Sequence, residues 1–349
     1  MLKGFYKNKK ILVTGHTGFK GSWLSLVLKN FDAHVYGISL KPEDKRGNLY
    51  NILKLNQKIN SYYIDLRDIK KLEKVIEKIK PDIVFHLAAQ PLVFESYRNP
   101  LDTIESNING LCNLLNILRN NKNLKSFLNV TTDKCYENNE VGKPFKESDR
   151  LGGDDIYSAS KACSEILTKS YFKSFYSHNK IGFATARAGN IIGGGDFGMD
   201  RIIPDFIESI EKNKYLSVRS PLSIRPWQHI FDVINGYLLL MKKTFENGNN
   251  FDSFNFSPSY RKFQNVKYIV TNMSKILNFN KIKFSKVNKN FKESKILKLN
   301  STKAKKKLGW TTQYNINETL EKTANWYLAY MKKQDMYDYS LNEVKKFFK

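Results

Sequence analysis

The chain has 349 residues, 41 % of them hydrophobic and 13 % aromatic, with 58 Lys and Arg against 33 Asp and Glu. This length and apolar fraction exclude a disordered chain and predict two domains, or one large domain, around a real core. No run reaches the roughly 18 uncharged apolar residues of a membrane span, and the lysine-rich start at residues 1–10 has no apolar segment behind it. We therefore expect a cytoplasmic protein with no membrane partner.

The formal net charge of +25 first indicates nucleic acid or another polyanion, because clustered cations bind phosphates with counterion release. The lysines are nevertheless dispersed, with only short runs such as 305–307, so we expect no nucleic-acid partner. The three cysteines, Cys112, Cys135 and Cys163, are too few and too scattered for a disulfide framework or a four-ligand zinc site. We expect a reducing compartment and no metal.

Short apolar runs alternate with helical segments through the first half of the chain. Strands are expected at 11–13, 33–38, 62–64, 83–85, 127–130 and 183–186. Helices are expected at 24–28, after the N-cap candidate Asp68, from Asn99 in one long helix through Asn107, and from Tyr157 to Phe172. This alternation predicts an α/β fold, a doubly wound and mostly parallel Rossmann sheet.

Beyond Ala186 the alternation stops. Residues 189–198 are glycine-rich, the following segments are short and contain prolines, 231–243 has a helical pattern, and 260–349 is rich in Lys and Asn. We predict a Rossmann domain made of 1–188 and about 229–258. A smaller, discontinuous C-terminal lobe, made of about 189–228 and 259–349, is expected to lie over the carboxyl edge of the sheet.

Glycines recur between the first strand and the first helix, in residues 15–21 (GHTGFKG). Glycine is needed where the backbone turns tightly and where a diphosphate approaches bare amides, and the helix N-terminus adds N–H donors. The motif therefore predicts dinucleotide binding. Lys20 either reaches a phosphate or is one more solvated lysine.

The second and third strands leave the identity of the dinucleotide open. An NAD-binding unit carries an acid after strand two to accept from the ribose 2′-OH, whereas residues 37–41 read GISLK. Ser39 offers a weaker hydrogen bond, and Lys41 or Arg46 would favour the 2′-phosphate of NADP. Asp65, after strand three, is expected to accept from the adenine amino group, or else to cap a helix. Small residues at 87–90 (LAAQ) would let a flat cofactor lie against the backbone.

Thr132, Tyr157 and Lys161 form the strongest candidate catalytic group. Tyr157 and Lys161 are four residues apart, so both project from one face of a helix. A phenol has a pKa of about 10, and an ammonium nearby favours the phenolate, which makes Tyr157 usable as a base near neutral pH. Thr132 ends an apolar strand, where its hydroxyl can bond a substrate oxygen. The alternative is a surface pair on a helix.

These motifs, in this order, resemble those of the extended short-chain dehydrogenase/reductase family, and within it the nucleotide-sugar 4,6-dehydratases. The resemblance spans nearly the whole chain and weakens only in the last few dozen residues. It is carried by residues 15–23 (GHTGFKGSW), 86–93 (HLAAQPLV), 131–136 (TTDKCY), 188–196 (AGNIIGGGD) and 225–229 (RPWQH). It implies NAD as a recycled cofactor, CDP-glucose as the substrate, and a dimer or higher homo-oligomer that pairs through the helices carrying Asn107 and Tyr157.

The resemblance also assigns an elimination pair. Asp133 would protonate the leaving C6 oxygen of the sugar, and Lys134 would occupy the position of the base that removes the C5 proton. Related dTDP-glucose dehydratases carry a glutamate there, so Lys134 either acts as a neutral base or stabilises the enolate. A salt bridge within a turn is the alternative for this pair.

The remaining candidates would hold the two ligands. For the cofactor we predict Gly15, Thr17, Gly18, Phe19, Lys20, Gly21, Ser39, Asp65, Leu66, Leu87, Ala88, Ala89, Gln90, Asn107, Tyr157 and Lys161. For the substrate we predict Asn190, Arg201, Arg219, Arg225 and His229, because arginine matches phosphate oxygens with paired donors. Structural roles are the alternatives for Asn190, as a turn residue, and for His229, as a core histidine; Arg187 either binds or holds the joint between the lobes.

The expected activity is dehydration of a CDP-sugar for the synthesis of surface-polysaccharide deoxysugars such as those of O-antigen. A dehydratase for another nucleotide sugar and a 4-epimerase are close alternatives, and the pair Asp133 and Lys134 favours a dehydratase because an epimerase needs no elimination. A non-catalytic protein that binds a dinucleotide and a polyanion is the alternative of another class. The intact pair Tyr157 and Lys161 argues against it.

Overall fold

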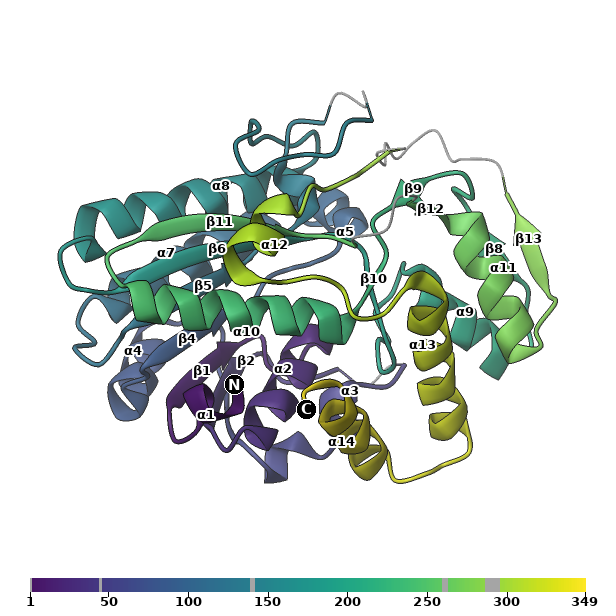
Figure 1. Cartoon of the computed structure of the whole chain (residues 1–349), viewed down its shortest axis with the longest axis horizontal. Helices are drawn as coiled ribbons and strands as arrows, with labels where there is room; N and C mark the ends of the chain where they lie inside the picture. Colours follow the sequence, from purple (N-terminus) through teal and green to yellow (C-terminus); the bar gives the residue numbers. More distant parts are fainter. Residues whose placement is uncertain (1, 44–45, 139–141, 259–262, 286–295) are drawn as a thin grey trace.

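A seven-stranded parallel sheet forms the centre of the computed structural model, which describes residues 2–43, 46–138, 142–258, 263–285 and 296–349 (Figure 1). The strand order is β3-β2-β1-β4-β5-β6-β11, with every neighbouring pair parallel. Their bounds are β1 Lys10–Thr14, β2 His34–Ser39, β3 Asn60–Tyr63, β4 Ile83–His86, β5 Ser126–Val130, β6 Gly182–Ala188 and β11 Phe251–Phe256. The expected doubly wound Rossmann fold is confirmed.

Helices cover both faces of this sheet because its strands are apolar on both sides. One face packs on α1 Leu2–Tyr6, α2 Phe19–Asn30, α3 Leu49–Ile52 and α10 Ile230–Asn247. The other packs on α4 Ile69–Ile79, α7 Gly110–Leu118, α8 Ile156–Tyr171 and the π-helical segment η4 Phe172–Tyr176 that continues α8. Two short 3₁₀ turns, η1 Leu55–Gln57 and η3 Asp133–Cys135, lie between these elements. The stretch 229–258 thus returns to the sheet through α10 and β11.

The expected long helix after Asn99 is present as one continuous helical run, with a π-helical stretch in its middle. It consists of α6 Pro100–Ile104, the π-helical segment η2 Glu105–Asn109 and α7, and a short helix, α5 Val93–Arg98, precedes it. A π segment widens the helix locally and is frequent at functional sites. It turns the side chain of Asn107 inward, where that side chain is buried. The third strand also begins two residues earlier than the expected 62–64.

The rest of the chain builds a smaller lobe at one end of the sheet (Figure 1). It contains three two-stranded pieces: β7 Ile191–Ile192 with β10 Gln228–His229, β8 Leu216–Val218 with β13 Ile282–Phe284, and β9 Ile224–Arg225 with β12 Gln264–Asn265. Its helices are α9 Ile202–Glu211, α11 Val266–Leu277 and α13 Ile316–Met331; α12 Thr302–Leu308 and α14 Met336–Phe347 lie against the Rossmann side. Among the described residues, no helix is both long enough and apolar enough to cross a membrane.

Candidate active site

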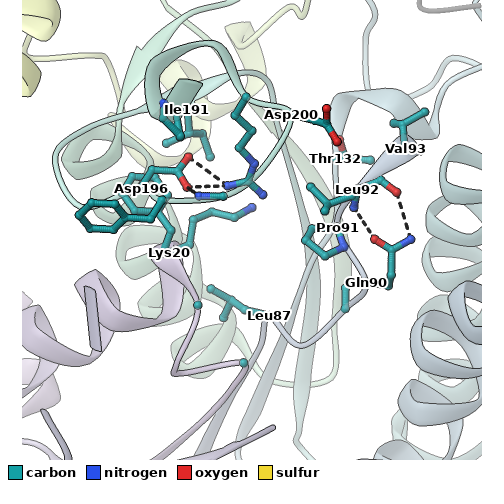
Figure 2. A pocket seen from close by; sticks show the side chains of 18 of the residues that line it. Lys20, Leu87, Gln90, Pro91, Leu92, Val93, Thr132, Ile191, Asp196 and Asp200 are labelled. Carbon is teal, nitrogen blue, oxygen red and sulfur yellow. Dashed lines mark hydrogen bonds and ion pairs between the residues drawn. The ribbon is translucent and has the colours of Figure 1, made fainter. Parts of the chain in front are cut away.

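A cavity of about 880 Å³ opens where the carboxyl ends of the parallel strands meet the smaller lobe (Figure 2). The loops after β1, β2, β4, β5 and β6 line one part of it, and residues from 188 to 227 line the rest. This is where ligands bind in open α/β sheets, at the crevice outside the strand ends. The cavity gathers most of the residues that the sequence motifs predict.

The glycine loop forms a tight cradle at the start of α2. Gly15 has a φ of +74°, and a Cβ atom there would lie 2.7 Å from the backbone N of Ala88. A Cβ on Gly21 would lie 2.1 Å from the carbonyl oxygen of Gly15. Only glycine fits these two positions, and Gly18 caps α2 without a side-chain bond. The bare amides at a helix N-terminus fit the diphosphate of a dinucleotide.

The end of strand two is filled by hydroxyl groups. Thr17 and Ser39 share a hydrogen bond of 2.7 Å, and both line the cavity. Arg46, a candidate cation for a 2′-phosphate, is engaged elsewhere, because its guanidinium pairs with Asp205 at 3.0 Å and Glu208 at 2.5 Å on α9. Arg46, which the sequence suggested as a partner of the NADP 2′-phosphate, is therefore paired with acidic side chains of α9 instead.

Asp65 lines the cavity next to Leu66, but its carboxylate is already bound. Arg67 donates to both Asp65 oxygens at 2.6 to 3.0 Å, and these hydrogen bonds lower the pKa of Asp65. Because Arg67 occupies both carboxylate oxygens, an adenine amino group that binds Asp65 would have to lie beside the Arg67 guanidinium. The expected adenine contact at Asp65 therefore stays a prediction.

Asn107 is buried and does not line the cavity. Its Oδ1 accepts from the backbone N of Gln90 at 2.7 Å, and its Nδ2 donates to the Gln90 carbonyl at 3.1 Å and to Ser160 Oγ at 2.9 Å. These bonds hold residues 87–90 against α8. The structure thus gives Asn107 a supporting position behind the predicted cofactor site, while Leu87, Ala88, Ala89 and Gln90 line the cavity itself.

The candidate catalytic residues come together at the centre of the cavity. Tyr157 and Lys161 lie on one buried face of α8, a helix that Asp155 caps by accepting from Ser158 N at 2.9 Å. Thr132 follows β5, and a side-chain hydrogen bond joins it to Tyr157. Tyr157, Thr132, Asp133 and Lys134 line the cavity, whereas Lys161 is buried outside its lining.

Burial dominates the electrostatics of this group. Desolvation raises the pKa of Tyr157 to about 12, and nearby Asp133 adds to the rise. Desolvation, followed by the charge of Lys20, lowers the pKa of Lys161 to about 7. We expected Lys161 to lower the pKa of Tyr157, but desolvation sets the direction of the shift and raises it.

Asp133 has the environment of a carboxylic acid. Its side chain is buried, and this burial raises its pKa against the opposing charge of Lys134. Thr132 Oγ1 donates to Asp133 Oδ1 at 3.1 Å. Within the described part of the chain, Asp133 Oδ2 is buried without a hydrogen-bond partner. An unpartnered carboxyl oxygen at the cavity is ready to hold or give a proton.

Lys20 extends from the first turn of α2 into the cavity, on the side of Asp196 (Figure 2). Burial and the charge of Arg201 lower its pKa to about 8, although Asp133 and Asp196 oppose the shift. It is therefore a cavity cation, and the alternative of a freely solvated lysine is wrong.

The predicted substrate residues divide into two groups. Asn190, Arg201, Arg219 and Arg225 line the cavity. Arg201 pairs with Asp196 at 3.0 Å, and Arg219 pairs with Asp200 at 3.3 Å while lying 4.8 Å over the ring of Phe94. These arginines are thereby aimed into the cavity from the lobe.

His229 is the exception among the predicted substrate residues. It is buried outside the cavity lining, where Nδ1 accepts from the backbone N of Phe231 at 3.2 Å and caps α10. The rings of Phe231 and Tyr314 pack against it at 4.9 and 5.1 Å. The structure therefore supports the core-histidine alternative and does not bring His229 to the substrate residues.

Sequence reasoning missed several residues of this site. Phe94, Asp196 and Asp200 line the cavity and contact the arginines. Asp196 and Arg201 are five residues apart and belong to an irregular loop, where no helical or strand spacing predicts which acid pairs with which arginine. Arg187 does not reach the cavity; it pairs with Glu165 on α8 at 2.8 Å, deep in the sheet. Glu165 and Arg187 lie on different elements, α8 and β6, so no helical spacing signals that pair.

Comparisons with known proteins agree with this geometry. The chain matches the family model described as GDP-mannose 4,6 dehydratase over residues 12–323. It is 38% identical over 348 residues to the CDP-glucose 4,6-dehydratase of Salmonella typhimurium, covering 98% of this chain and 97% of that protein.

Two solved structures share the fold. The UDP-glucose 4-epimerase of Thermotoga maritima with UDP-glucose has a TM-score of 0.80 at 24% identity, covering 92% of this chain and 99% of the other. The dTDP-glucose 4,6-dehydratase of Bacillus anthracis in complex with NAD has a TM-score of 0.78 at 20% identity, covering 93% and 98%. At these identities the likeness supports the architecture alone.

Proposed function

The chain belongs to the GDP-mannose 4,6-dehydratase family, and on that premise we propose that it is an NAD-dependent lyase that dehydrates CDP-D-glucose to CDP-4-dehydro-6-deoxy-D-glucose. CDP is proposed as the nucleotide because the relative of that name matches nearly the whole chain. NAD is proposed as the cofactor because the glycine cradle fits a dinucleotide and Arg46 is tied to α9. NAD held at the glycine loop of residues 15–21 would supply the redox chemistry, accepting a hydride at C4 of the sugar and giving it back at C6.

The residues at the centre of the cavity divide the proton transfers. Tyr157 removes the proton of the C4 hydroxyl, and Thr132 holds that oxygen. Oxidation at C4 acidifies the C5 proton, which leaves to a base at the position of Lys134. The C6–O bond then breaks as Asp133 protonates the departing oxygen, so that one water is released. When the hydride is returned to C6, the base at the position of Lys134 gives its proton back to C5, which completes the 4-dehydro-6-deoxy sugar. Lys161 supports Tyr157 from the next turn of α8.

The buried, unpartnered carboxyl oxygen of Asp133 is the observation that carries this proposal. Loss of C6 oxygen as water requires a protonated acid at the site of oxidation. A 4-epimerase requires none, because its sugar keeps every oxygen. An acid with a raised pKa next to Thr132 and Tyr157 therefore supports elimination.

The two parts of the fold are proposed to divide the ligands. Residues 1–188 with about 229–258 hold the cofactor, and about 189–228 with 259–349 hold the nucleotide sugar. Arg201 and Arg225 line the same cavity as Tyr157, and their charges act on Tyr157 and Asp133, respectively, so we propose that they bind the diphosphate of a substrate seated at Tyr157.

We also propose a homodimer formed through the helices near Asn107 and Tyr157. Ile166 on α8, Phe175 in η4 and Leu101 on α6 are exposed, at 56%, 43% and 72% of their surfaces. Burying such apolar side chains against a second copy is favourable. Light scattering of the purified chain measures the oligomeric mass directly.

The three cysteines are free, which supports a reducing, cytoplasmic location.

A nucleotide-sugar screen tests the proposed function. The purified chain with NAD is incubated with CDP-, dTDP-, GDP- and UDP-glucose, and products are weighed by mass spectrometry. We expect CDP-glucose to give a product lighter by one water. A product of unchanged mass but altered C4 stereochemistry would establish an epimerase, and unchanged sugar would end the proposal.

A matched pair of variants tests the role of Asp133. Asp133→Asn cannot protonate the C6 oxygen, so we expect elimination to slow by about 10²- to 10⁴-fold while C4 oxidation continues and reduced cofactor accumulates. Asp154→Asn removes an exposed carboxyl outside the cavity lining and should behave as wild type. A wild-type rate of water loss in Asp133→Asn would remove this residue from the reaction.

A further inference from the structure

The turn that carries Thr132, Asp133 and Lys134 is held at both ends by one buried ion pair. Glu165 on α8 and Arg187 on β6 pair at 2.8 Å, with side chains only 1% and 4% exposed. They lie behind the cavity and do not line it. A buried pair of this kind is weak evidence for stability but is suited to fixing geometry.

The first end of the turn is fixed by Glu165. Thr131 Oγ1 donates to Glu165 Oε1 at 2.5 Å, and the Thr131 backbone N donates to the Ala186 carbonyl at 2.9 Å. Thr131 precedes Thr132 directly, so its position sets where the turn leaves β5.

The second end of the turn is fixed by Arg187. Its Nη1 donates to the Tyr136 hydroxyl at 2.8 Å, and that hydroxyl donates to Asn255 Oδ1 at 2.7 Å. The Tyr136 ring stacks on Phe145 at 4.8 Å. Tyr136 follows Lys134 by two residues, so the elimination pair lies between two anchors that share one ion pair.

The same ion pair reaches the helix that carries the base. Glu165 is four residues beyond Lys161 and eight beyond Tyr157, on the same buried face of α8. Tyr157 and Lys161 lie on α8, whereas Asp133 and Lys134 lie on the turn that follows β5. Glu165 and Arg187 therefore connect two groups of reacting side chains that belong to different elements.

We propose that Glu165 and Arg187 are positioning residues that set the place of Asp133 and Lys134 relative to Tyr157, and so govern water elimination more than C4 oxidation. The inference rests on the proposed function. If the turn is loosened, Tyr157 keeps its place on the helix and still removes the proton of the C4 hydroxyl, and only the contact of Thr132 with that oxygen is weakened. Asp133 and Lys134 move with the turn, and a misplacement of about 1 Å can cost roughly 10²-fold in rate.

The chain offers a matched pair of threonines for the test. Thr131 and Thr185 both donate a hydroxyl hydrogen bond to Glu165, at 2.5 and 2.6 Å, but only Thr131 belongs to the turn. Threonine to valine keeps the shape and removes the hydroxyl. Both full-length variants are mixed with NAD and CDP-glucose, and reduced nicotinamide is followed by absorbance during one turnover, beside melting temperature and product mass.

We expect Thr131→Val to raise the peak of reduced cofactor and to slow water loss at least about 10-fold, with a nearly unchanged KM. Thr185→Val should show a similar drop in melting temperature, but its ratio of water loss to C4 oxidation should be that of wild type. Tyr136→Phe should repeat the Thr131→Val result from the other end of the turn. Tyr176→Phe is its control, since Tyr176 donates instead to the Leu115 carbonyl, away from the turn.

The outcomes separate the inference from the proposed function. A wild-type chain that yields no dehydrated product overturns both. The positioning role alone is overturned if the wild-type chain is active and the ratio of water loss to C4 oxidation is the same in Thr131→Val and Thr185→Val. It is also overturned if Thr131→Val loses C4 oxidation and water loss equally. If Thr131→Val fails to fold, the ratio of water loss to C4 oxidation in Tyr136→Phe decides the question.

Discussion

The two walls of the cavity are built from different materials. The cofactor wall, residues 15–21 and 87–90, presents backbone amides and small side chains packed so closely that a single methyl group collides with the chain. The substrate wall, Arg201, Arg219 and Arg225 with Asp196 and Asp200, presents long side chains, two of them aimed by ion pairs. One wall is fixed by backbone geometry and the other by exchangeable side chains.

This difference indicates which of the two binding surfaces can change by substitution. A backbone donor belongs to every residue and cannot be redirected by substitution, so the cofactor wall suits a ligand that stays the same. An arginine and its acid can be replaced together, so the substrate wall suits ligands that differ in base and sugar. Tyr157, the proposed base for the C4 hydroxyl proton, lines the cavity with both walls.

Tyr157→Phe carries the largest expected effect and asks whether the chemistry is independent of both walls. Removing the hydroxyl should lower the rate of C4 oxidation by about 10²- to 10⁴-fold. Calorimetry should find the affinities for NAD and CDP-glucose within about twofold of wild type, because neither wall has changed. Tyr237→Phe is the control: Tyr237 is buried nearby, and its hydroxyl has no partner among the described residues. Equal loss of binding and rate in Tyr157→Phe would make this tyrosine part of a wall.

Gly21→Ala tests the cofactor wall alone. The new Cβ would lie 2.1 Å from the Gly15 carbonyl and 2.7 Å from His16 Cα, so backbone must shift. Such overpacking costs about 1–3 kcal/mol, and we expect NAD affinity to fall about 10- to 100-fold in calorimetry. Gly4→Ala, where nothing lies within 4 Å of the new atom, should keep wild-type affinity. A Gly21→Ala chain with wild-type NAD affinity and melting temperature would show that the backbone of the cofactor wall can accommodate a Cβ atom at this position.

His229→Asn gives the smallest effect and sharpens the border of the substrate wall. Burial lowers the pKa of His229 from 6.5 to about 3, so the folded chain holds it neutral while the unfolded chain takes up a proton below pH 6.5. Its contribution to stability is therefore present above pH 6.5 and lost as the pH falls. Asparagine still caps α10, so at pH 5 the variant should lose about 2 kcal/mol less than wild type relative to pH 7, by urea unfolding.

The same variant tests the original assignment of His229 to the substrate. We expect its KM for CDP-glucose to stay within twofold of wild type, because the ring lies outside the cavity lining. A KM raised tenfold with unchanged pH dependence of stability would return His229 to the substrate wall.

The cofactor wall could be read from the sequence because its constraints are local. Gly15 and Gly21 are required by backbone contacts within a few residues or on the next strand, and such requirements appear directly as residue types. The face shared by Tyr157 and Lys161 follows from helical spacing. The parallel sheet followed from the alternation of apolar strands and helices.

The substrate wall could be predicted only in part because its residues lie in irregular segments, where no regular spacing sets which side chains meet. The arginines were recognised by chemistry, but their partners Asp196 and Asp200 were not. The π segment around Asn107, whose side chain bonds Gln90, was not predicted either, since helix propensities do not record such a tertiary contact. His229 shows the limit: a buried cap and a binding histidine have the same residue type.

A hydrogen bond from Trp23 limits how the two walls can move apart. Its Nε1, on the helix that begins at the glycine loop, donates to the Gly194 carbonyl at 2.9 Å, two residues before the Asp196 that holds Arg201. Tyr327 donates to the Asp196 carbonyl at 2.6 Å from the far side of the lobe. These two bonds tie the Rossmann side to the loop that carries Asp196 and tie that loop to α13. We therefore expect any opening of the cavity for ligand exchange to be smallest beside Trp23, and the fluorescence of its indole would report such a movement.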